Sequence, residues 1–504
     1  MNIKQAKEEI KNTVKAYLYK NADGEYAIPE VRQRPVLLIG PPGVGKTQIM
    51  EQIARECHIG LVAYTITHHT RQSAVGLPFI MKENYGGNEY SVTRYTMSEI
   101  IASVYDKIKE TGLEEGILFI DEINCVSETL APTMLQFLQC KTFGNQKVPK
   151  GWVIVAAGNP PEYNKSVREF DMVTLDRVRN IDIEADFSIW KEYAREQGIN
   201  GAILSYLELR PQNFYRIEND VDGMKFVTAR GWEDLSNLID VYDRLGIEVD
   251  ENIIAEYIRH DDVANDMAAY LSLYYKYQDD YGIEEILKGR VKAGIYARLV
   301  NASFDEKLSV VNMVISGLNK RFENVYREKY VTDRWYEFLG EYKEKKDYTT
   351  LMSERKKRVE TNEKAGFYNR LESECENIVS RYIKENLPEE WMNYEQALAK
   401  EKEAFGKQCE ILENAQSDAG KALENAFDFM EAAFGEKTDQ SGQYMVIFVT
   451  ELTMSGYSSA YLADNTCERY MKYSENMLIG TRRAELLSEL KVGDIKENET
   501  HSDL

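Results

Sequence analysis

The residues with the clearest chemical purpose form one short run near the start of the chain. An apolar segment leads into a glycine-rich turn and then a helix-like stretch, in the order Gly40, Pro41, Pro42, Gly43, Val44, Gly45, Lys46, Thr47 and Gln48. Glycines let backbone N–H groups curl around a phosphate chain, and the following helix adds its partial positive charge. Lys46 is placed to reach terminal phosphates and Thr47 to ligate Mg²⁺. The run predicts a nucleoside triphosphate site rather than a turn that binds nothing.

A second run places two acids side by side. Residues 116–120 are Gly-Ile-Leu-Phe-Ile, and Asp121 and Glu122 follow directly. Such a run is typical of a buried strand whose carboxyl end emerges at the ligand edge of a sheet. It lies roughly seventy-five residues after the glycine-rich turn, which suits a metal-binding acid for that turn. Asp121 is therefore expected near the magnesium, and Glu122 is expected to orient and deprotonate the attacking water.

A third apolar run ends in an amide. Residues 152–157 are followed by Gly158, Asn159 and two prolines. If this strand lies beside the other two, Asn159 can hold the attacking water between Glu122 and the terminal phosphate. The alternative is an asparagine in an ordinary turn before proline.

These residues need a scaffold, and the pattern from about residue 35 to 185 supplies one. Strands alternate with helices, which predicts a parallel sheet covered on both faces. The expected strands are Val36–Ile39, Leu61–Thr67, Gly116–Asp121, Trp152–Ala157 and Asn180–Glu184, and the expected helices are Lys46–Cys57, Ser98–Glu110 and Thr129–Cys140. A hairpin is expected from Phe79–Lys82 and Tyr90–Tyr95 around Gly86-Gly87-Asn88. Its tip, near Tyr85–Tyr90, is either a pore-facing loop or a passive surface hairpin.

The remainder reads as helical. Residues 4–18 fit a short amphipathic helix, and one apolar register runs along Leu398, Phe405, Cys409, Leu412, Ala419, Leu423, Ala426, Met430 and Phe434. We interpret that stripe as a helix packed on its own domain, with a partner coiled coil as the alternative. Gly406 and Gly420 argue against one long unbroken rod. Residues 444–453 form a buried helix or a strand.

Length and pattern together divide the chain. At about 150 residues per domain, 504 residues exceed one core. The predicted parts are residues 1–34, an N-terminal helix and linker; 35–190, an α/β nucleotide-binding core; 191–320, a helical lid; 321–490, an acidic helical extension; and 491–504, a disordered tail.

Composition narrows the partners. The formal net charge of −22 argues against bulk affinity for nucleic acid. Six cysteines without a CxxC pair indicate reduced thiols, and His68-His69 is expected in a polar loop rather than at a metal. Neither a signal peptide nor a membrane-spanning run is recognisable, so we expect a cytoplasmic protein without membrane contact.

The three motifs together resemble those of AAA+ ATPases. The runs concerned are Gly40–Thr47, Asp121-Glu122-Ile123-Asn124 and Ala157-Gly158-Asn159-Pro160. The Asp-Glu-Ile-Asn form and Gly76-Leu77-Pro78 look like the MoxR and dynein-related branch, and the resemblance covers about residues 30–240. It implies a P-loop sheet of order 5-1-4-3-2 with a helical lid, binding ATP and Mg²⁺.

The resemblance also implies roles for two arginines. Leu175-Asp176-Arg177 stands where the family carries its arginine finger, so Arg177 would act on ATP bound by a neighbouring subunit. Thr228-Ala229-Arg230 stands at the sensor 2 position, so Arg230 would contact the γ-phosphate in the same subunit. Val178 replaces the usual Phe after the finger, which leaves Arg179 or Arg168 as alternatives. Thr-Ala-Arg-Gly likewise departs from the more usual Ser-Pro-Arg.

The resulting functional prediction is a ring-forming, hexameric Mg-ATPase that remodels a protein client. MoxR-type ATPases often act with a separate von Willebrand factor A domain protein, whose Asp-x-Ser-x-Ser run is absent from this sequence. The alternatives are a dynein-related nucleic-acid or restriction-type motor, possibly using GTP, and a nucleotide-gated scaffold. The motor's Met-Asn-Thr-Ala-Asp signature is absent, and intact Glu122 and Asn159 disfavour the scaffold.

Overall fold

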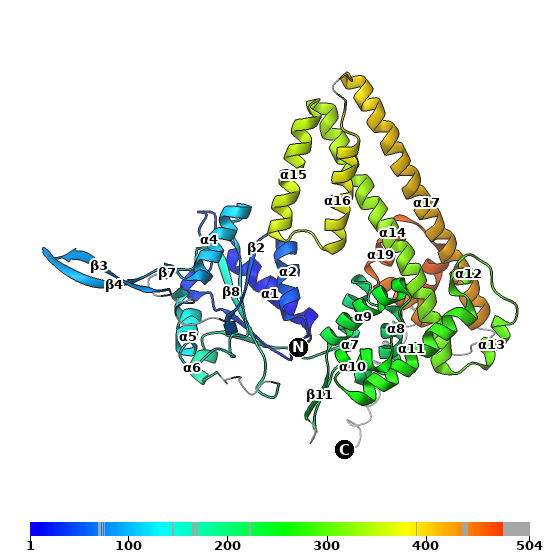
Figure 1. Ribbon diagram of the computed structural model, residues 1–504, viewed down its shortest axis with the longest axis horizontal. Helices are drawn as coiled ribbons and strands as arrows, with labels where there is room; N and C mark the ends of the chain where they lie inside the picture. The colour runs from blue at the N-terminus through cyan, green and yellow to red at the C-terminus, as the bar shows by residue number, and fades with distance from the viewer. Residues whose placement is uncertain are drawn as a thin grey trace, which may run out of the picture.

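The structure is a computed structural model that describes most of residues 1–476 (Figure 1). The residues outside the description are 69–71, 73, 75, 144, 145, 164–166, 168, 169, 221, 222, 390, 436–441 and 477–504, together with the side chains of His68, Asn219 and Asp220. The predictions for His68-His69, Arg168 and the tail from residue 491 therefore lie outside the described residues. Figure 1 shows an α/β core, a helical lid, and long helices that rise from the lid to an apex.

The core is built on a five-stranded parallel sheet. Its strand order is β2 (Gly60–Thr65), β5 (Gly116–Asp121), β8 (Trp152–Gly158), β1 (Val36–Ile39) and β9 (Arg179–Asp182). Counting these strands along the chain and reading from β9 gives 5-1-4-3-2, so the predicted P-loop AAA+ topology is confirmed. Every residue of β8 is buried, as expected for a central parallel strand covered on both faces.

Helices cover both faces because successive strand residues point to opposite sides. Val36 and Leu38 of β1 pack with α1 (Ile3–Leu18) and α2 (Lys46–Cys57), whereas Leu37 packs on the other face. That face carries α4 (Glu99–Thr111) and α5 (Ala131–Cys140). Shorter elements complete the core, namely η1 (Glu30–Arg32), η2 (Ile66–His68), β6 (Thr142–Phe143), β7 (Gln146–Lys147) and α6 (Met172–Leu175).

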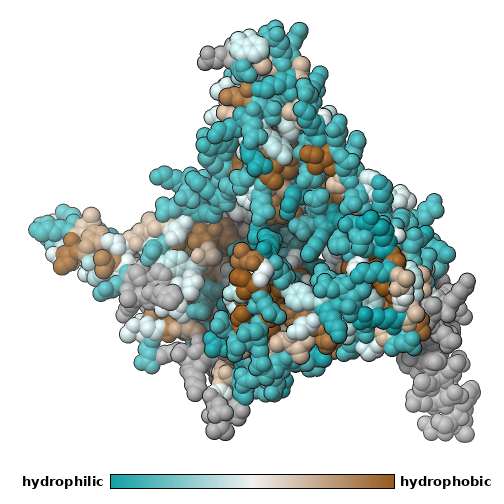
Figure 2. All heavy atoms as spheres, turned by 45° about the vertical axis from the view of Figure 1, so that its right-hand side comes forward, coloured by the Kyte–Doolittle hydropathy of each residue, from teal (hydrophilic) through white to brown (hydrophobic). Residues whose placement is uncertain are grey.

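A hairpin projects from the core, as Figure 1 shows at its left edge. Strands β3 (Pro78–Tyr85) and β4 (Asn88–Tyr95) pair antiparallel along their whole length, so the predicted hairpin is confirmed and extends further than expected. The large exposed apolar side chains on this arm are Phe79, Ile80, Met81, Tyr85, Tyr90 and Tyr95. Figure 2 shows hydrophobic residues on the projecting arm.

The lid follows the core. Its helices are α7 (Phe187–Glu196), α8 (Gly201–Leu209), α9 (Ala229–Leu245), α10 (Glu251–Tyr257), α11 (Asp261–Tyr281), α12 (Ile283–Leu287) and α13 (Ile295–Asn301), with η3 (Pro211–Asn213) between α8 and the next strand. A hairpin of β10 (Arg216–Asp220) and β11 (Gly223–Val227) interrupts them. The sequence interpretation that the remainder of the chain is helical is wrong for this hairpin.

Two long helices dominate the C-terminal half. These are α14 (Phe304–Lys345) and α17 (Tyr394–Phe434), accompanied by α15 (Tyr348–Ala365), α16 (Arg370–Glu385), α18 (Gln443–Met454) and α19 (Gly456–Asp464). The expectation against one unbroken rod at Gly406 and Gly420 is wrong, because α17 is continuous. Residues 444–453 form a helix. No described helix is both long and apolar enough to cross a bilayer.

The helical half has two hydrophobic cores. One joins the lid to the lower halves of α14 and α17, and includes Val325 and Phe434. The other lies nearer the apex and begins at Val331. The predicted division between residues 320 and 321 falls inside α14, which runs through it without a break. The apolar stripe of α17 packs on these cores of its own chain, so the interpretation as a helix packed on its own domain is confirmed.

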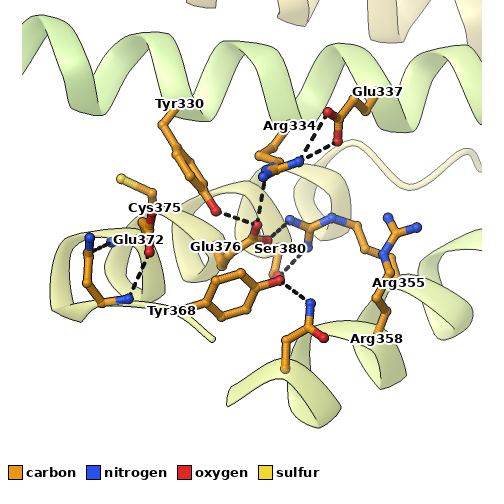
Figure 3. Close-up of polar contacts among 12 residues, drawn as sticks. Tyr330, Arg334, Glu337, Arg355, Arg358, Tyr368, Glu372, Cys375, Glu376 and Ser380 are labelled. Atoms are coloured by element: carbon orange, nitrogen blue, oxygen red, sulfur yellow. Dashed lines mark hydrogen bonds and ion pairs between the residues drawn. The ribbon is translucent and has the colours of Figure 1, made fainter. Parts of the chain in front are cut away.

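The apex helices are tied together by a buried ion pair, shown in Figure 3. Arg355 of α15 contacts Glu376 of α16 and donates to Ser380 Oγ at 2.7 Å, while Tyr330 of α14 donates to Glu376 Oε1 at 3.1 Å. Because Glu376 is only 2% exposed, removing one partner would leave a buried charge unmatched. The turn between α15 and α16 returns to the core, where Arg55 Nε of α2 donates to the backbone oxygen of Gly366 at 3.4 Å.

Candidate active site

The glycine-rich turn connects the carboxyl end of β1 to the N-terminus of α2. Gly43 and Gly45 have φ of 74° and 90°, in the left-handed region that glycine adopts without strain. A Cβ at Gly43 would lie 3.3 Å from Cβ of Arg230, so the lid sits directly against the turn. Glycine here provides the backbone curvature and the close approach of the lid.

Lys46 is buried at the centre of this turn. Its Nζ donates to the backbone oxygens of Gly40 at 2.8 Å and Pro41 at 2.9 Å, and to Asn159 Oδ1 at 2.9 Å. Burial lowers the pKa of Lys46 to about 8, against a smaller opposing effect of Asp121. The ammonium is thus held by neutral oxygens that an arriving phosphate can replace.

Thr47 and Asp121 meet next to Lys46. Thr47 Oγ1 donates to Asp121 Oδ2 at 3.1 Å, joining the first turn of α2 to the carboxyl end of β5. Asp121 Oδ1 accepts from the backbone N–H of Glu122 at 2.9 Å. A hydroxyl and a carboxylate are hard oxygen ligands of the kind that Mg²⁺ takes alongside waters and phosphates. The two side chains therefore fit the predicted metal.

Glu122 has an unusual backbone. Its φ is 57°, in the left-handed region that non-glycine residues rarely adopt. Its Oε2 accepts a hydrogen bond from Thr67 Oγ1 at 2.9 Å. A strained residue of this kind costs about 1–3 kcal/mol and is commonly found at functional sites. The Glu122 carboxylate therefore has a different partner from the Asp121 carboxylate, which accepts from Thr47.

Asn159 is held in place by a residue to which the sequence analysis gave no role. Asn124 Nδ2 donates to the backbone oxygen of Asn159 at 2.7 Å, and Asn124 Oδ1 accepts from its N–H at 3.3 Å. A Cβ at Gly158 would lie 2.4 Å from Asn124 Oδ1, so a larger residue there would have to displace the Asn124 side chain. The fourth position of the Asp-Glu-Ile-Asn run was the available signal for this buried amide.

The lid reaches the turn through two tyrosines. Tyr215 donates to the backbone oxygen of Pro42 at 2.9 Å. Gln48 Nε2 donates to the hydroxyl of Tyr193, which donates in turn to Glu233 Oε1 at 3.0 Å. Neither tyrosine was singled out from sequence, because tyrosine is abundant here and the contacts join distant segments.

Arg230 is the second residue of α9, whose N-cap is Thr228. Thr228 Oγ1 accepts from the N–H of Gly231 at 3.2 Å. The Arg230 side chain is exposed, and its charge is among the causes that lower the pKa of Lys46. The structure thus brings Arg230 near the lysine that is predicted to bind phosphate.

Arg177 lies at the other edge of the sheet. It precedes β9, whose first residue Arg179 donates its N–H to the oxygen of Pro35 at the start of β1. The exposed Arg177 guanidinium donates to Gln139, whereas Arg179 is occupied by Glu9 of α1. Val178, which replaces the expected Phe, is buried in the core. Arg177 is therefore not brought to the glycine-rich turn of its own chain.

Comparison with known families agrees with this arrangement. Residues 35–178 match the family model described as the AAA domain of the dynein-related subfamily. These residues are similar to an AAA+ domain, and their sheet has the strand order of the P-loop AAA+ fold. The match contains the glycine-rich turn, Asp121-Glu122, Asn159 and Arg177, and it ends before the lid. No curated protein matches the chain. The AAA+ domain and the contacts among Lys46, Thr47 and Asp121 support nucleotide binding and ATPase activity.

Proposed function

We propose that the chain is a Mg-dependent ATPase of the MoxR type that remodels a protein client. Lys46 and the loop amides bind the phosphates, while Thr47 and Asp121 would hold a Mg²⁺ ion. When bound, the ion supplies charge neutralisation at the phosphates. Glu122 takes the proton of the attacking water, and Asn159 positions that water. The carrying observation is the direct contact between Lys46 and Asn159, which joins two separate motifs in one site.

The active form is a homo-oligomeric ring, proposed as a hexamer. Arg177 lies at the amino edge of the sheet, whereas the glycine-rich turn lies at the carboxyl edge. A neighbouring copy can bring its Arg177 to this chain's nucleotide, and Arg230 contacts the γ-phosphate from within the same chain. Neutralisation in trans is worth about a thousandfold or more in rate, so hydrolysis depends on assembly.

The β3–β4 hairpin is the proposed contact with the client. Its antiparallel register places Phe79, Met81, Tyr85, Tyr90 and Val92 on one face. An isolated two-stranded ribbon is marginally stable in water, and an apolar face rimmed by polar groups suits a polypeptide partner. The two cations of the hairpin, Lys82 and Arg94, are paired with carboxylates of the same hairpin, whereas the other exposed side chains include many aromatic and aliphatic ones, which favours a protein over a nucleic acid.

The helical extension is proposed to dock a partner, which in MoxR-type systems is a von Willebrand factor A domain protein. Nucleotide cycling would move the lid against the core through the contacts of Tyr215 with Pro42 and of Tyr193 with Gln48. The cytoplasmic location expected from the sequence stays a prediction.

The direct test replaces Glu122 with Gln. ATP binding should persist, because Lys46 and Thr47 are unchanged, while turnover falls by about a hundredfold to ten-thousandfold. Glu114→Gln, an exposed acid ahead of the same strand, is the matched control and should keep full turnover. Turnover that survives Glu122→Gln would show that the assigned base is wrong.

The same variant can identify the client. A hydrolysis-deficient ring holds its client longer, so proteins retained by Glu122→Gln in ATP but released in ADP are candidates. Phe79→Ser and Tyr90→Ser on the exposed arm should abolish that retention and leave ATP affinity unchanged. Retention that is unchanged by these substitutions would remove the hairpin from the client site.

A further inference from the structure

A cavity of about 450 Å³ opens at the amino edge of the sheet, away from the glycine-rich turn. Its walls are the segment before β1, the end of α5, the loop between β7 and β8, and the residues just before β9. This volume lies in the usual range for small-molecule sites. The cavity takes no part in the chemistry described above, apart from Arg177 at its lining.

The cavity is strongly basic in an acidic protein. The chain has 84 acidic and 62 basic residues, yet five cationic side chains and two carboxylates, Glu30 and Asp176, line this space. The cations are Arg32, Arg34, Lys141, Lys147 and Arg177. Within the described ranges, none of these five forms an ion pair with a carboxylate. Lys141 is half-buried, and the other four cations are exposed. Like charges gathered in one space repel one another, so a bound anion would stabilise the arrangement.

Lys141 is held in this cavity by an unusual backbone. It caps the C-terminus of α5 with φ of 54°, where glycine or asparagine is the common choice. Its Nζ donates to the backbone oxygen of Glu30 at 2.8 Å, and burial lowers its pKa to about 8. An ammonium has three donors, and this hydrogen bond uses one of them. A lysine therefore occupies a strained and desolvated position with donor capacity remaining.

Trp152 adds an unpaired donor to the same lining. Its side chain is 3% exposed and packs tightly against Gly60 and Gly116, where a Cβ would lie within 2.9 Å of the ring. The indole Nε1 is buried without a hydrogen-bond partner in the described part of the chain. Buried donors are rarely left unpaired, so the indole N–H is a donor that a ligand bound against Trp152 could satisfy.

We propose that this basic cavity is a second anion site, which binds a phosphate chain through Lys141 and the neighbouring guanidinium groups. Several cations in one small space suit a polyphosphate better than a single carboxylate. Guanidinium groups also match the oxygens of phosphate in pairs. The phosphate chain has two possible sources: a free polyphosphate or nucleotide, or the ATP carried by a neighbouring copy. The second source rests on the proposed function, since Arg177 lines the cavity.

The first arm of the test removes the nucleotide site. In a Lys46→Ala chain, inorganic tripolyphosphate is titrated by calorimetry and by tryptophan fluorescence, with Trp152→Phe as the spectroscopic reference. If the cavity binds a free polyphosphate, the Lys46→Ala chain still binds tripolyphosphate. The double variant Lys46→Ala, Lys141→Met then binds it at least tenfold more weakly. Lys150→Met, an exposed lysine outside the lining, should leave the affinity unchanged. If Lys141→Met fails to fold, Arg34→Gln takes its place.

The second arm tests whether the phosphate chain belongs to the ATP of a neighbouring copy. If it does, the Lys46→Ala chain binds no tripolyphosphate. The Lys141→Met variant alone then lowers turnover at least tenfold without changing the affinity for ATP. Mixing Lys141→Met with Glu122→Gln copies then restores turnover, because each supplies what the other lacks. Equal titrations and equal turnover for Lys141→Met and Lys150→Met would overturn the site. Displacement of tripolyphosphate by a single-stranded oligonucleotide at equal phosphate concentration would also overturn it. The tripolyphosphate arm does not need ATPase activity, so it remains readable if the proposed function fails.

Discussion

The two edges of the central sheet carry similar cations in opposite surroundings. At the carboxyl edge, Lys46 is held by two backbone oxygens and Asn159, with Asp121 close by. At the amino edge, Lys141 and its neighbouring arginines lack carboxylate partners within the described residues. Burial lowers the pKa of both lysines to about 8. The cation at the carboxyl edge thus already has hydrogen-bond partners, whereas the cations at the amino edge lack partners of opposite charge within the described residues.

Under the proposed function, this difference lets one fold supply both halves of a shared site. The groups proposed to bind metal and to position water need fixed positions, and side-chain hydrogen bonds hold two of them at strand ends, Asp121 by Thr47 and Asn159 by Lys46. Groups that act on a neighbour must instead stay available at the surface, and Arg177 is exposed. The predictions below separate the two edges by their effects on binding and on turnover.

Among the variants that follow, the largest effect is expected at the amino edge. Arg177→Ala should lower turnover by about a thousandfold, because charge on the γ-phosphate is no longer neutralised in trans. ATP affinity should change little, since Lys46 belongs to the other edge. Arg179→Ala is the control, because Arg179 is occupied by Glu9 of its own chain. Steady-state turnover within threefold of the unchanged protein would remove Arg177 from the reaction.

At the carboxyl edge, Asn159→Ala should lower turnover by about a hundredfold or more, the usual cost of losing one positioned polar group. Its amide oxygen also contacts Lys46 Nζ, so ATP affinity is expected to shift as well. Asn180→Ala, an exposed residue of β9, should change neither turnover nor ATP affinity. Separate measurement of kcat and of the ATP dissociation constant distinguishes the edges. An effect on kcat as small as that of Asn180→Ala would contradict the positioning role.

Gly158→Ala disturbs the carboxyl edge without changing a charge. The new Cβ would lie 2.4 Å from Asn124 Oδ1, so we expect a loss of about 1–3 kcal/mol in the free energy of unfolding. Gly406→Ala in α17 has no atom within 4 Å of its new Cβ and should stabilise by about 0.5–1 kcal/mol. Urea denaturation measures both. Equal effects of the two substitutions would show that Asn124 yields freely.

The smallest effect concerns pH. Lys46 has a folded-state pKa of about 8, below the ordinary value of 10.5, and must be protonated to bind phosphate. Above pH 8 the protein must take up a proton on binding ATP, so affinity should fall by about tenfold per pH unit. Lys46→Arg should flatten that dependence, because guanidinium stays charged. Dissociation constants between pH 7 and 9.5 test this.

The same lowered pKa affects stability with the opposite sign. Between about pH 8 and 10.5 the unfolded chain holds a proton on Lys46 that the folded chain has released. The contribution of this group to stability therefore rises with pH across that window. Denaturation at pH 7.5 and 9.5, compared with Lys46→Met, isolates the contribution.

Much of the α/β core could be predicted because its strands are continuous apolar runs that end in special residues. Val36–Ile39 ends at a glycine, and Gly116–Asp121 ends at paired acids, so both sets of bounds were predicted correctly. The hairpin β10–β11 was missed because Arg216, Glu218 and Asp220 give its first strand a polar pattern. Only its pairing with β11 makes it a strand.

Contacts between distant segments determine the features that could not be predicted from the sequence. Two glycines cost about 1 kcal/mol each in a helix, but packing of α17 on α14 outweighs that cost. The left-handed backbone of Glu122 could not be predicted, because glutamate is not a residue type that indicates a positive φ. The basic cavity was also missed, because Arg34, Lys141 and Arg177 come from distant segments.

The shared core of the lid has a consequence for how the protein is made. Every strand of the sheet is complete by Asp182, whereas the lid core still needs Phe434 and Cys467. At about 5–20 residues per second, the lid helices emerge on the order of ten seconds before these partners. We expect the α/β core to fold first on the ribosome. The lid helices would keep apolar surface exposed until their C-terminal partners are synthesised. A premature stop codon before Cys467 would then leave a folded nucleotide domain attached to an unfinished lid.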